Sequence, residues 1–586
     1  MAVRSAMRAL FVFLLAWGAA PARATPTLAP YELLRAAFAA RSPSQAESAF
    51  SRSAVIRAQA RSGRTELLGR EAIGRHFAAS LQGAGGARPL DLNFRRTAST
   101  SSSSGWRDAG YFLVQGSGAE PTYGQFAAAL ARDADGTVRI VRAETRVATE
   151  AEFEEAGAPL LFAADTEVLS AYYNRFLGRY RRSGGCDVVV TRTLRRLWAL
   201  DNCTLDWRSL SRVAGREWTG GGRVISADAV TRYRFESAAG QTPRRLRIDA
   251  AAAAVRPAYA NRIEPYRIEQ IGFTSADGTA LAGQIWIPAN NSRRIGIALA
   301  HGSGAQDRNG YASFLAVLAD QLAARGYTVV TYDKRGVGRS GGEWARASFA
   351  VLADDLAAAA SALRARRDLV DPGRVGIGGS SQAGWISAKA VERGAAPAFI
   401  FLVGAGGSAM PVTVQNRYNV GVSMRCAGFR EEQIATVLDQ NEAFYAFRRD
   451  PRTAPALDRK TAQGASDRAI AEWLLPDSAN VDASGGAWYS VMEIDFDPLP
   501  VWRRFPGQLI FVQGDMDDQT PADVVRERLA GLDPRRLSLH MLPGGQHLGL
   551  RARDVCEGAR FEAMTGFHPG LFEAIDGLEG RLARMD

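Results

Sequence analysis

The chain has 586 residues, of which 46% are hydrophobic and 23% are charged, a composition that excludes collagen-like, coiled-coil and wholly disordered chains. So long a chain exceeds one hydrophobic core, and we expect roughly two to four domains. The net charge of +11 does not indicate a nucleic-acid partner, because scattered arginines supply nearly all of it and only three residues are lysine.

The N-terminus is typical of a secretory signal peptide. Two arginines precede the apolar run 9–17, and Ala22-Arg23-Ala24 is a small-x-small cleavage site. The run is shorter than the about 20 residues of a membrane-spanning helix. We therefore predict that residues 1–24 are removed near Ala24, and that the mature protein is periplasmic or secreted with no stable membrane span.

Residues 25–150 combine helical and strand-like patterns. The expected elements are an Ala-rich helical stretch at Tyr31–Phe50, a second at Leu67–Phe77, a serine-rich loop at Ser99–Ser104 and a strand at Thr137–Glu144. The Gly-Arg-Glu-Ala-Ile segment at 69–73, followed by late strands, resembles the cone-shaped α+β domain of nuclear transport factor 2 and SnoaL-like proteins. The resemblance implies a domain that can bind a ligand or form a homodimer, and it assigns no function.

Residues 155–255 are predicted to form a small β-rich module. Its strand-like runs are Cys186–Thr191 and Ala229–Phe235, with glycine-rich turns at 184–185 and 220–222. The run Ala250–Val255, followed by Pro257, is expected to be a linker.

Four cysteines fit an oxidising compartment: Cys186, Cys203, Cys426 and Cys556. Three pairings are possible, and proximity in the sequence favours Cys186–Cys203, which leaves Cys426–Cys556. No cysteine and histidine spacing typical of a metal site is present, so we expect no metal.

From residue 263 to 586, strand-like and helix-like runs alternate, which predicts an α/β fold. The expected strands are Ile295–Ala300, Thr328–Tyr332, Val375–Ile377, Ala398–Val403, Leu509–Val512 and Leu537–Leu542, and two of the helices are Ser313–Arg325 and Leu352–Arg367. The interval 408–495 breaks this alternation, because it is helix-prone and rich in aromatic residues. We interpret it as a cap inserted over the active edge of the sheet.

The segment Arg374–Gly384 carries the most specific signal. A short apolar strand runs into Gly379-Ser380-Ser381-Gln382-Ala383, and a helical run follows, which is the layout of a nucleophile elbow. With Ser381 as nucleophile the flanking positions are Gly379 and Ala383. With Ser380 one flank is Gln382, which is bulky for so tight a turn, so Ser381 is favoured.

A serine nucleophile needs a base and an acid that orients the base. Acids follow the strand Leu509–Val512 in the loop 514–521, and His547 follows the strand Leu537–Leu542. His547 is preferred to His540, which lies in a strand, and to His568, which lies near the end. The order serine, acid, histidine is that of α/β-hydrolase folds.

An oxyanion hole requires two backbone N–H groups. One is expected from Gln382, directly after the nucleophile. The second is expected from the loop His301-Gly302-Ser303-Gly304, with Ser303 first and Gly302 second. His301 itself is interpreted as structural.

The segment 336–341 matches the dinucleotide pattern G-x-G-x-x-G. A lone match is weak, and no second strand ends in an acid about 20 residues on. We interpret it as a tight loop that lines the site or supports the elbow.

Three segments together resemble the α/β-hydrolase superfamily, in the branch of serine esterases, dienelactone hydrolases and prolyl-oligopeptidase-like enzymes. They are 301–308, Tyr332–Ser340 and 379–384. Loops of the form Gly-x-x-Asp-x-x-x-Pro in that family place the catalytic acid at Asp517, while Asp515 and Asp518 stay open. Ala383 departs mildly from the commoner glycine.

The resemblance implies hydrolysis through an acyl-serine intermediate without a cofactor. The favoured function is an exported esterase, acting on a small-molecule or acyl substrate and not on nucleic acid. A peptidase or amidase with the same triad is the alternative, and a non-catalytic binding protein is the third hypothesis.

Overall fold

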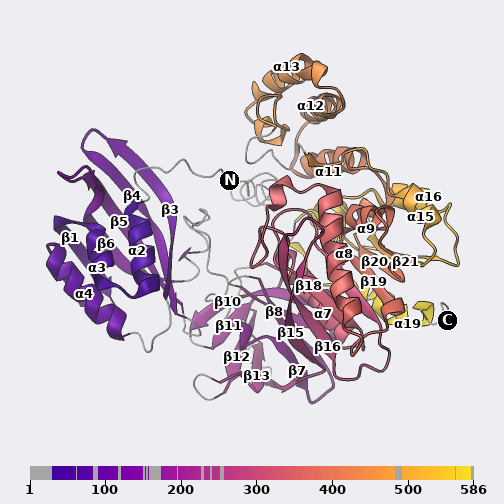
Figure 1. The fold of residues 1–586 in the computed structure, drawn as a ribbon, viewed down its shortest axis with the longest axis horizontal. Coiled ribbons are helices and arrows are strands. Elements are labelled where there is room, and N and C mark those ends of the chain that lie inside the picture. Colours follow the sequence, from indigo (N-terminus) through magenta and orange to yellow (C-terminus); the bar gives the residue numbers. More distant parts are fainter. Residues whose placement is uncertain are drawn as a thin grey trace.

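A computed structural model describes residues 29–582 except 61–62, 84–89, 117–120, 150–151, 154–155, 157–172, 194–195, 215, 226–229, 238–240, 251–256, 405, 482–490 and 561–562. The predicted signal peptide, residues 1–24, lies outside the described residues, as does most of the predicted linker. Among the helices that the structure describes, none has both the length and the hydropathy to cross a bilayer. Figure 1 shows three successive parts of the chain.

The N-terminal part is an α+β domain around a six-stranded sheet of order β2-β1-β6-β5-β4-β3. Its elements are α2 (Ala29–Ala40), α3 (Pro43–Ser48), β1 (Phe50–Ala60), β2 (Gly63–Leu68), α4 (Arg70–Gly83), β3 (Leu90–Ser102), β4 (Gly105–Gly116), β5 (Thr122–Arg132) and β6 (Val138–Ala148). Only β1 and β6 pair in parallel. The rings of Tyr31, Phe94 and Phe126 pack together in its core. The likeness to nuclear transport factor 2 stays a prediction.

The expected serine-rich loop is mostly strand. Ser99 to Ser102 belong to β3, which pairs with β4 up to Ser102 opposite Gly105. These residues are exposed, so neither face of the strand carries the apolar alternation that identifies a strand in a sequence.

The middle part is a closed barrel of order β10-β11-β12-β13-β14-β7-β8-β9. Its strands are β7 (Gly178–Arg182), β8 (Asp187–Arg192), β9 (Leu197–Asp201), β10 (Trp207–Ala214), β11 (Glu217–Gly220), β12 (Thr231–Glu236), β13 (Arg245–Ala250) and β14 (Ala258–Ile263). Buried Tyr180, Trp218 and Phe235 fill the interior. The strand β14 closes the barrel against β7 and lies beyond residue 255, where the predicted module ends.

The C-terminal part has an eight-stranded sheet of order β15-β16-β18-β17-β19-β20-β21-β22. Its strands are β15 (Tyr266–Thr274), β16 (Ala280–Pro288), β17 (Gly296–Ala300), β18 (Thr328–Tyr332), β19 (Val375–Ser380), β20 (Phe399–Val403), β21 (Gln508–Gly514) and β22 (Leu537–Leu542). All pairings from β17 onward are parallel, which confirms the predicted α/β fold. The antiparallel hairpin β15–β16 adds an edge that the sequence did not predict.

Helices cover both faces of this sheet: α8 and α9 lie together on one face, as Figure 1 shows, and α7 and α18 pack on the other. Each face of the sheet has its own apolar cluster, one around α8 and α9 and the other around α7 and α18. The helices are α7 (Phe314–Ala323), α8 (Phe349–Ala365), α9 (Ala383–Glu392), α15 (Leu499–Arg504), α16 (Ala522–Leu529), α17 (Val555–Gly558), α18 (Pro569–Asp576) and α19 (Leu578–Leu582), with short 3-10 turns η1 (Tyr311–Ser313), η2 (Trp344–Arg346) and η3 (Pro372–Arg374).

A helical segment between β20 and β21 corresponds to the predicted cap. It contains α10 (Gly406–Ala409), α11 (Val412–Cys426), α12 (Glu431–Arg449), η4 (Pro451–Thr453), α13 (Ala454–Ala465) and η5 (Ala471–Trp473), and Figure 1 shows α12 and α13 standing away from the sheet. The disulfide Cys426–Cys556 ties α11 to α17, and Cys186–Cys203 links the residue before β8 to the turn after β9. Both pairs are those favoured by the sequence.

The barrel docks on the C-terminal domain through backbone and aromatic contacts. The N–H of Trp207 donates to the Thr565 carbonyl at 3.2 Å, and the N–H of Phe567 donates to the Leu205 carbonyl at 2.8 Å. The rings of Trp207 and Phe567 lie 4.9 Å apart. Buried Arg179 of the barrel pairs with Asp320 of α7 at 2.9 Å. The two parts therefore share one apolar cluster.

Candidate active site

Ser381 lies in a sharp turn between β19 and α9. Its φ is 55°, in the left-handed region that non-glycine residues rarely occupy. The N–H of Ser381 donates to the Val403 carbonyl at 3.0 Å, which fixes the turn against the end of β20. Such strained residues cluster at functional sites and cost of order 1–3 kcal/mol each. The strand, turn and helix predicted for an elbow are all present.

The residues on either side of Ser381 have to be small. A Cβ on Gly379 would lie 2.1 Å from the Ala300 carbonyl oxygen and 2.7 Å from the Ala383 Cβ. Ser380, by contrast, is the last residue of β19 and only 5% exposed. The geometry thus favours Ser381, which is half-buried, as the serine that a substrate can reach.

Asp517 and His547 meet at the carboxyl end of the sheet. His547 follows β22, Asp517 follows β21, and the distance from His547 Nδ1 to Asp517 Oδ2 is 2.9 Å. The Asp517 carboxylate also accepts from the N–H groups of Gln519 and Thr520 and from Gln513 Nε2. These bonds hold the carboxylate in place, so it orients the imidazole with Nδ1 as the donor and Nε2 as the free base.

Electrostatics keep His547 basic although it is buried. Burial lowers the pKa of the imidazole, but the Asp517 carboxylate raises it by more, so the pKa lies above its ordinary value. His547 Nε2 is buried and has no hydrogen-bond partner within the described part of the chain. That atom is the one that would receive a proton from a serine hydroxyl.

Ser381 and His547 are both packed against the end of β20. Ser381 is bonded to Val403, and a Cβ on the next residue, Gly404, would lie 3.0 Å from His547 Cε1. No hydrogen bond joins Ser381 Oγ to His547, although the structure describes both residues.

The other acids in the predicted loop have different surroundings. Asp515 Oδ1 accepts from the Gly544 N–H at 2.7 Å. Neither oxygen of Asp518 has a hydrogen-bond partner among the described residues, and burial, together with the charge of Asp517, raises its pKa to about 8. Only Asp517 of the three bonds to His547.

The other two histidine candidates make hydrogen bonds elsewhere in the fold. His540 Nε2 lies 2.9 Å from Ser538 Oγ within β22, and His568 caps α18 by accepting from the Gly570 N–H. Both roles are structural.

The expected oxyanion loop lies beside the nucleophile. A Cβ on Gly302 would lie 3.6 Å from the Ser381 Cβ. No hydrogen bond from the N–H of Gln382 or of Ser303 occurs within the described part of the chain. His301 is buried, and its Nε2 lies 2.5 Å from the Tyr332 carbonyl. Burial and the nearby charge of Lys334 lower the pKa of His301 to about 3.

Sequence reasoning missed three side chains at this site. Lys334 Nζ bonds to the carbonyls of Gly302 and Gly304 and to Gln382 Oε1. From helix α11, Tyr418 and Asn419 donate to the carbonyls of Asp517 and Asp518. The only available signal for Lys334 was its position, directly after a predicted strand.

The glycine pattern at 336–341 forms a tight loop around Asp333. Asp333 accepts from Arg308 Nη2 at 2.7 Å and from the Arg339 N–H at 2.9 Å, and a Cβ on Gly338 would lie 2.4 Å from Asp333 Oδ2. The next long helix, α8, begins only at Phe349, so no helix N-terminus follows the glycines as dinucleotide binding requires.

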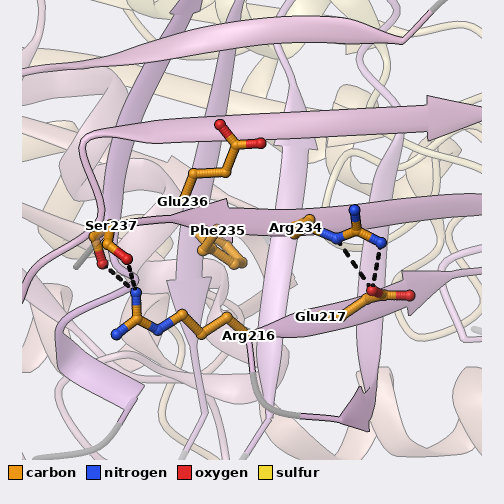
Figure 2. A pocket seen from close by; sticks show the side chains of 6 residues that line it. All are labelled: Arg216, Glu217, Arg234, Phe235, Glu236 and Ser237. Atoms are coloured by element: carbon orange, nitrogen blue, oxygen red, sulfur yellow. Dashed lines mark hydrogen bonds and ion pairs between the residues drawn. The ribbon is translucent and has the colours of Figure 1, made fainter. Parts of the chain in front are cut away.

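Other features of the described residues point away from alternative sites. Within them, no three or more His, Cys, Asp or Glu side chains cluster as metal ligands would. Figure 2 shows an open hollow on the barrel, lined by Arg216, Glu217, Arg234, Phe235, Glu236 and Ser237. Its charged groups already have partners. Figure 2 shows Arg234 bonded to Glu217 and Arg216 to Ser237, and Glu236 accepts from Arg245. It lies on strands β11 and β12, away from Ser381.

Comparison with known proteins agrees with this architecture. Residues 297–557 match the model of the alpha/beta hydrolase family. No curated protein matches the chain.

Similar solved structures include three esterases. That of Pyrococcus furiosus has 14% identity, covers 54% of this chain and 90% of its own, and has a TM-score of 0.33. The malate-bound esterase of Thermogutta terrifontis has 16% identity and a TM-score of 0.31, and the match covers 54% of this chain and 99% of the esterase. The esterase of Rhodococcus sp. ECU1013 has 15% identity, 55% and 100% coverage and a TM-score of 0.30. Likeness at this level says nothing about a substrate. The family match and the sheet that carries it show that the C-terminal domain of this chain has the α/β-hydrolase fold.

Proposed function

We propose that this protein is a serine hydrolase that cleaves carboxylic esters through an acyl-enzyme on Ser381. The observation that carries the proposal is the pair His547 and Asp517, 2.9 Å apart, beside an elbow that holds Ser381 at a left-handed φ of 55°. A base oriented by an acid next to a strained serine is what an acyl-transfer nucleophile requires.

In the first half-reaction the Ser381 hydroxyl gives its proton to His547 Nε2 while Oγ bonds to the ester carbonyl carbon. The carbonyl oxygen becomes an oxyanion. Collapse of this intermediate breaks the bond to the alkoxy oxygen, which leaves as an alcohol with the proton from His547. Asp517 keeps the imidazole oriented and stabilises its charged form.

In the second half-reaction water replaces the alcohol. His547 takes a proton from the water while the water oxygen attacks the acyl carbon. His547 then returns the proton to Ser381 Oγ as the carboxylic acid leaves. The N–H groups of Gln382 and Ser303, with Gly302 as the second choice in the loop, would stabilise both oxyanions. Such donors are worth about 10²–10³ in kcat each.

The nucleophile is tested by labelling with a fluorophosphonate probe. We expect Ser381→Ala to lose labelling and ester hydrolysis, while the matched variant Ser380→Ala keeps both, because Ser380 lies within β19. Labelling that persists in Ser381→Ala would contradict the assignment of Ser381 as the nucleophile.

The substrate class is tested with p-nitrophenyl esters of graded chain length against aminoacyl anilides. Preference for esters supports the proposal. Preference for anilides would instead indicate a peptidase or amidase with the same triad, and no turnover of either would favour a binding protein.

Export is also part of the proposal. It is supported by the N-terminal pattern of residues 1–24 and by the two disulfides. N-terminal sequencing of protein from the periplasm or medium should begin near Thr25. A mature chain that retains Met1 would contradict cleavage.

A further inference from the structure

Lys334 is a buried cation at the carboxyl end of the sheet, directly after β18. Its side chain is almost inaccessible, with the residue only 2% exposed. Nζ donates to the Gly302 carbonyl at 2.6 Å, to the Gly304 carbonyl at 2.8 Å and to Gln382 Oε1 at 3.1 Å. An ammonium group has three donors and no acceptor, so these three neutral partners take up its whole hydrogen-bonding capacity.

Burying a charge without a paired carboxylate is costly, so a group of this kind calls for an explanation. The fold alone supplies none, because each acid near Lys334 has another cation. Asp355 is bound by Arg335 at 2.6 Å, and Asp333 is bound by Arg308 at 2.7 Å. The partners of Lys334 are instead the two segments proposed to form the oxyanion hole.

The contacts of Lys334 determine which way the backbone of the loop faces. In a trans peptide the C=O and the following N–H point in opposite directions. Because Lys334 binds the Gly302 carbonyl from one side, the Ser303 N–H is directed to the other. The third contact fixes the Gln382 side chain with its oxygen toward Lys334, since an amide N–H₂ could not accept from an ammonium.

We propose that Lys334 is the positioning residue of the oxyanion hole, holding the loop 302–304 and Gln382 at a fixed separation on either side of Ser381. This inference rests on the proposed function, because it assigns Lys334 to the stabilisation of the same intermediates. Lys334 touches no reacting atom and acts through the donors that it orients.

Titration of Lys334 should therefore appear in the activity. Burial lowers its pKa to about 7, and the charge of Asp355 opposes this shift. Neighbouring His301 is neutral in this range, because its pKa is about 3, and Asp333 is held by Arg308. A neutral amine has only two donors, so one of the three contacts is lost as the pH rises through this pKa.

The test compares wild type with Lys334→Met, using p-nitrophenyl ester turnover and inhibition by an aryl trifluoromethyl ketone. The ketone forms a tetrahedral adduct with a serine and needs the same hole. We expect kcat to fall about 10²-fold, KM to stay within about threefold, and the inhibition constant to rise in parallel with the loss of kcat/KM. The alkaline limb of kcat/KM should also vanish.

Two further variants complete the experiment. Gln382→Met removes the hydrogen bond from Lys334 Nζ to the Gln382 side chain. It should give a smaller loss of kcat/KM with a parallel rise in the inhibition constant, and it keeps the test available if Lys334→Met does not fold. Lys460→Met, on exposed helix α13, should match wild type. Wild-type kcat and inhibition in Lys334→Met or Gln382→Met would overturn the inference, and so would a loss of kcat with unchanged inhibition. Failure of the proposed function is distinct, since wild type itself would then not turn over the ester.

Discussion

Asp517 and Asp518 are consecutive residues, each 1% exposed, with opposite electrostatic surroundings. Asp517 accepts hydrogen bonds from the backbone N–H groups of Gln519 and Thr520, from Gln513 Nε2 and from His547 Nδ1. Asp518 receives none from the described residues, and burial holds its pKa near 8. At neutral pH Asp518 is therefore mostly a neutral acid.

This contrast separates the effects of two conservative substitutions on catalysis. Asp517→Asn should lower kcat by about 10⁴, since an amide favours the wrong histidine tautomer. It should also move the acid limb of kcat/KM to lower pH, because the carboxylate raises the pKa of His547. Asp518→Asn should keep kcat within a few-fold at pH 7. Ester hydrolysis between pH 5 and pH 9 checks both, and equal losses in the two variants would contradict these assignments.

The same carboxyl makes stability depend on pH. Folded Asp518 keeps its proton up to about pH 8, whereas the unfolded chain releases it near its ordinary value of 3.8. Over that interval the native state binds more protons, so this group lowers stability as pH rises. Thermal unfolding of Asp518→Asn should therefore show a higher Tm than wild type, by more at pH 8 than at pH 5. A difference that shrinks with pH would contradict the raised pKa.

At the scale of elements, the elbow depends on the close approach of β17, β19 and α9. The Gly379 backbone has a φ of +144°, and its Cα faces the Ala300 carbonyl at a distance that leaves no room for a methyl group. Ala383 packs on the same point from the helix side. The strain at Ser381 persists because these neighbours over-determine the turn.

Substitutions at the two flanks should therefore differ in effect. Gly379→Ala should displace β19 or the turn and abolish fluorophosphonate labelling, with a loss of stability above about 3 kcal/mol. Ala383→Gly creates no clash and should cost only about 0.5–1 kcal/mol of helix stability. Urea unfolding and labelling of both variants measure this. A fully labelled Gly379→Ala enzyme would show that the turn has more freedom than its contacts imply.

At the scale of the whole molecule, the barrel and the C-terminal domain share one apolar core, and we expect them to unfold together. Trp207 and Trp198 of the barrel share an apolar cluster with Phe314 and Phe567 of the C-terminal domain. The ion pair of Arg179 with Asp320 is buried in the same contact. The core of the N-terminal domain, in contrast, contains only residues of that domain.

Truncations should follow this division. A chain of residues 173–586 should unfold at the same temperature as the mature protein and keep its ester hydrolysis within about twofold. A chain of residues 263–586 should aggregate, because it exposes Phe314, Phe567 and the unpaired charge of Asp320. Size-exclusion chromatography, thermal unfolding and activity test this. A soluble, active 263–586 fragment would contradict a shared core.

The sequence predicted the parts of the fold that depend on local pattern. The run Thr328–Tyr332 predicted the bounds of β18, because buried parallel strands are nearly continuous apolar runs. The hairpin β15–β16 escaped prediction, since β15 is an edge strand whose exposed and half-buried residues show no apolar run. The strand β14 escaped as well, because its role in closing the barrel depends on a partner, β7, far away in the sequence.

By itself the sequence determined the candidate chemistry of this protein: a serine turn between small residues, followed in order by acids and a histidine, and two cysteine pairs. The serine turn and the loops with the acids and the histidine are local, since each depends on the sterics of a turn or on the end of one strand. The cysteine pairs followed instead from the count of four and the proximity of Cys186 to Cys203. Only the tertiary structure decided that Asp517 and not Asp518 bonds to His547, and that Lys334 joins both sides of the proposed oxyanion hole. Burial and hydrogen bonding between distant segments set those outcomes. The family's loop spacing only favoured Asp517 over its neighbours, and nothing along the chain indicates the contacts of Lys334.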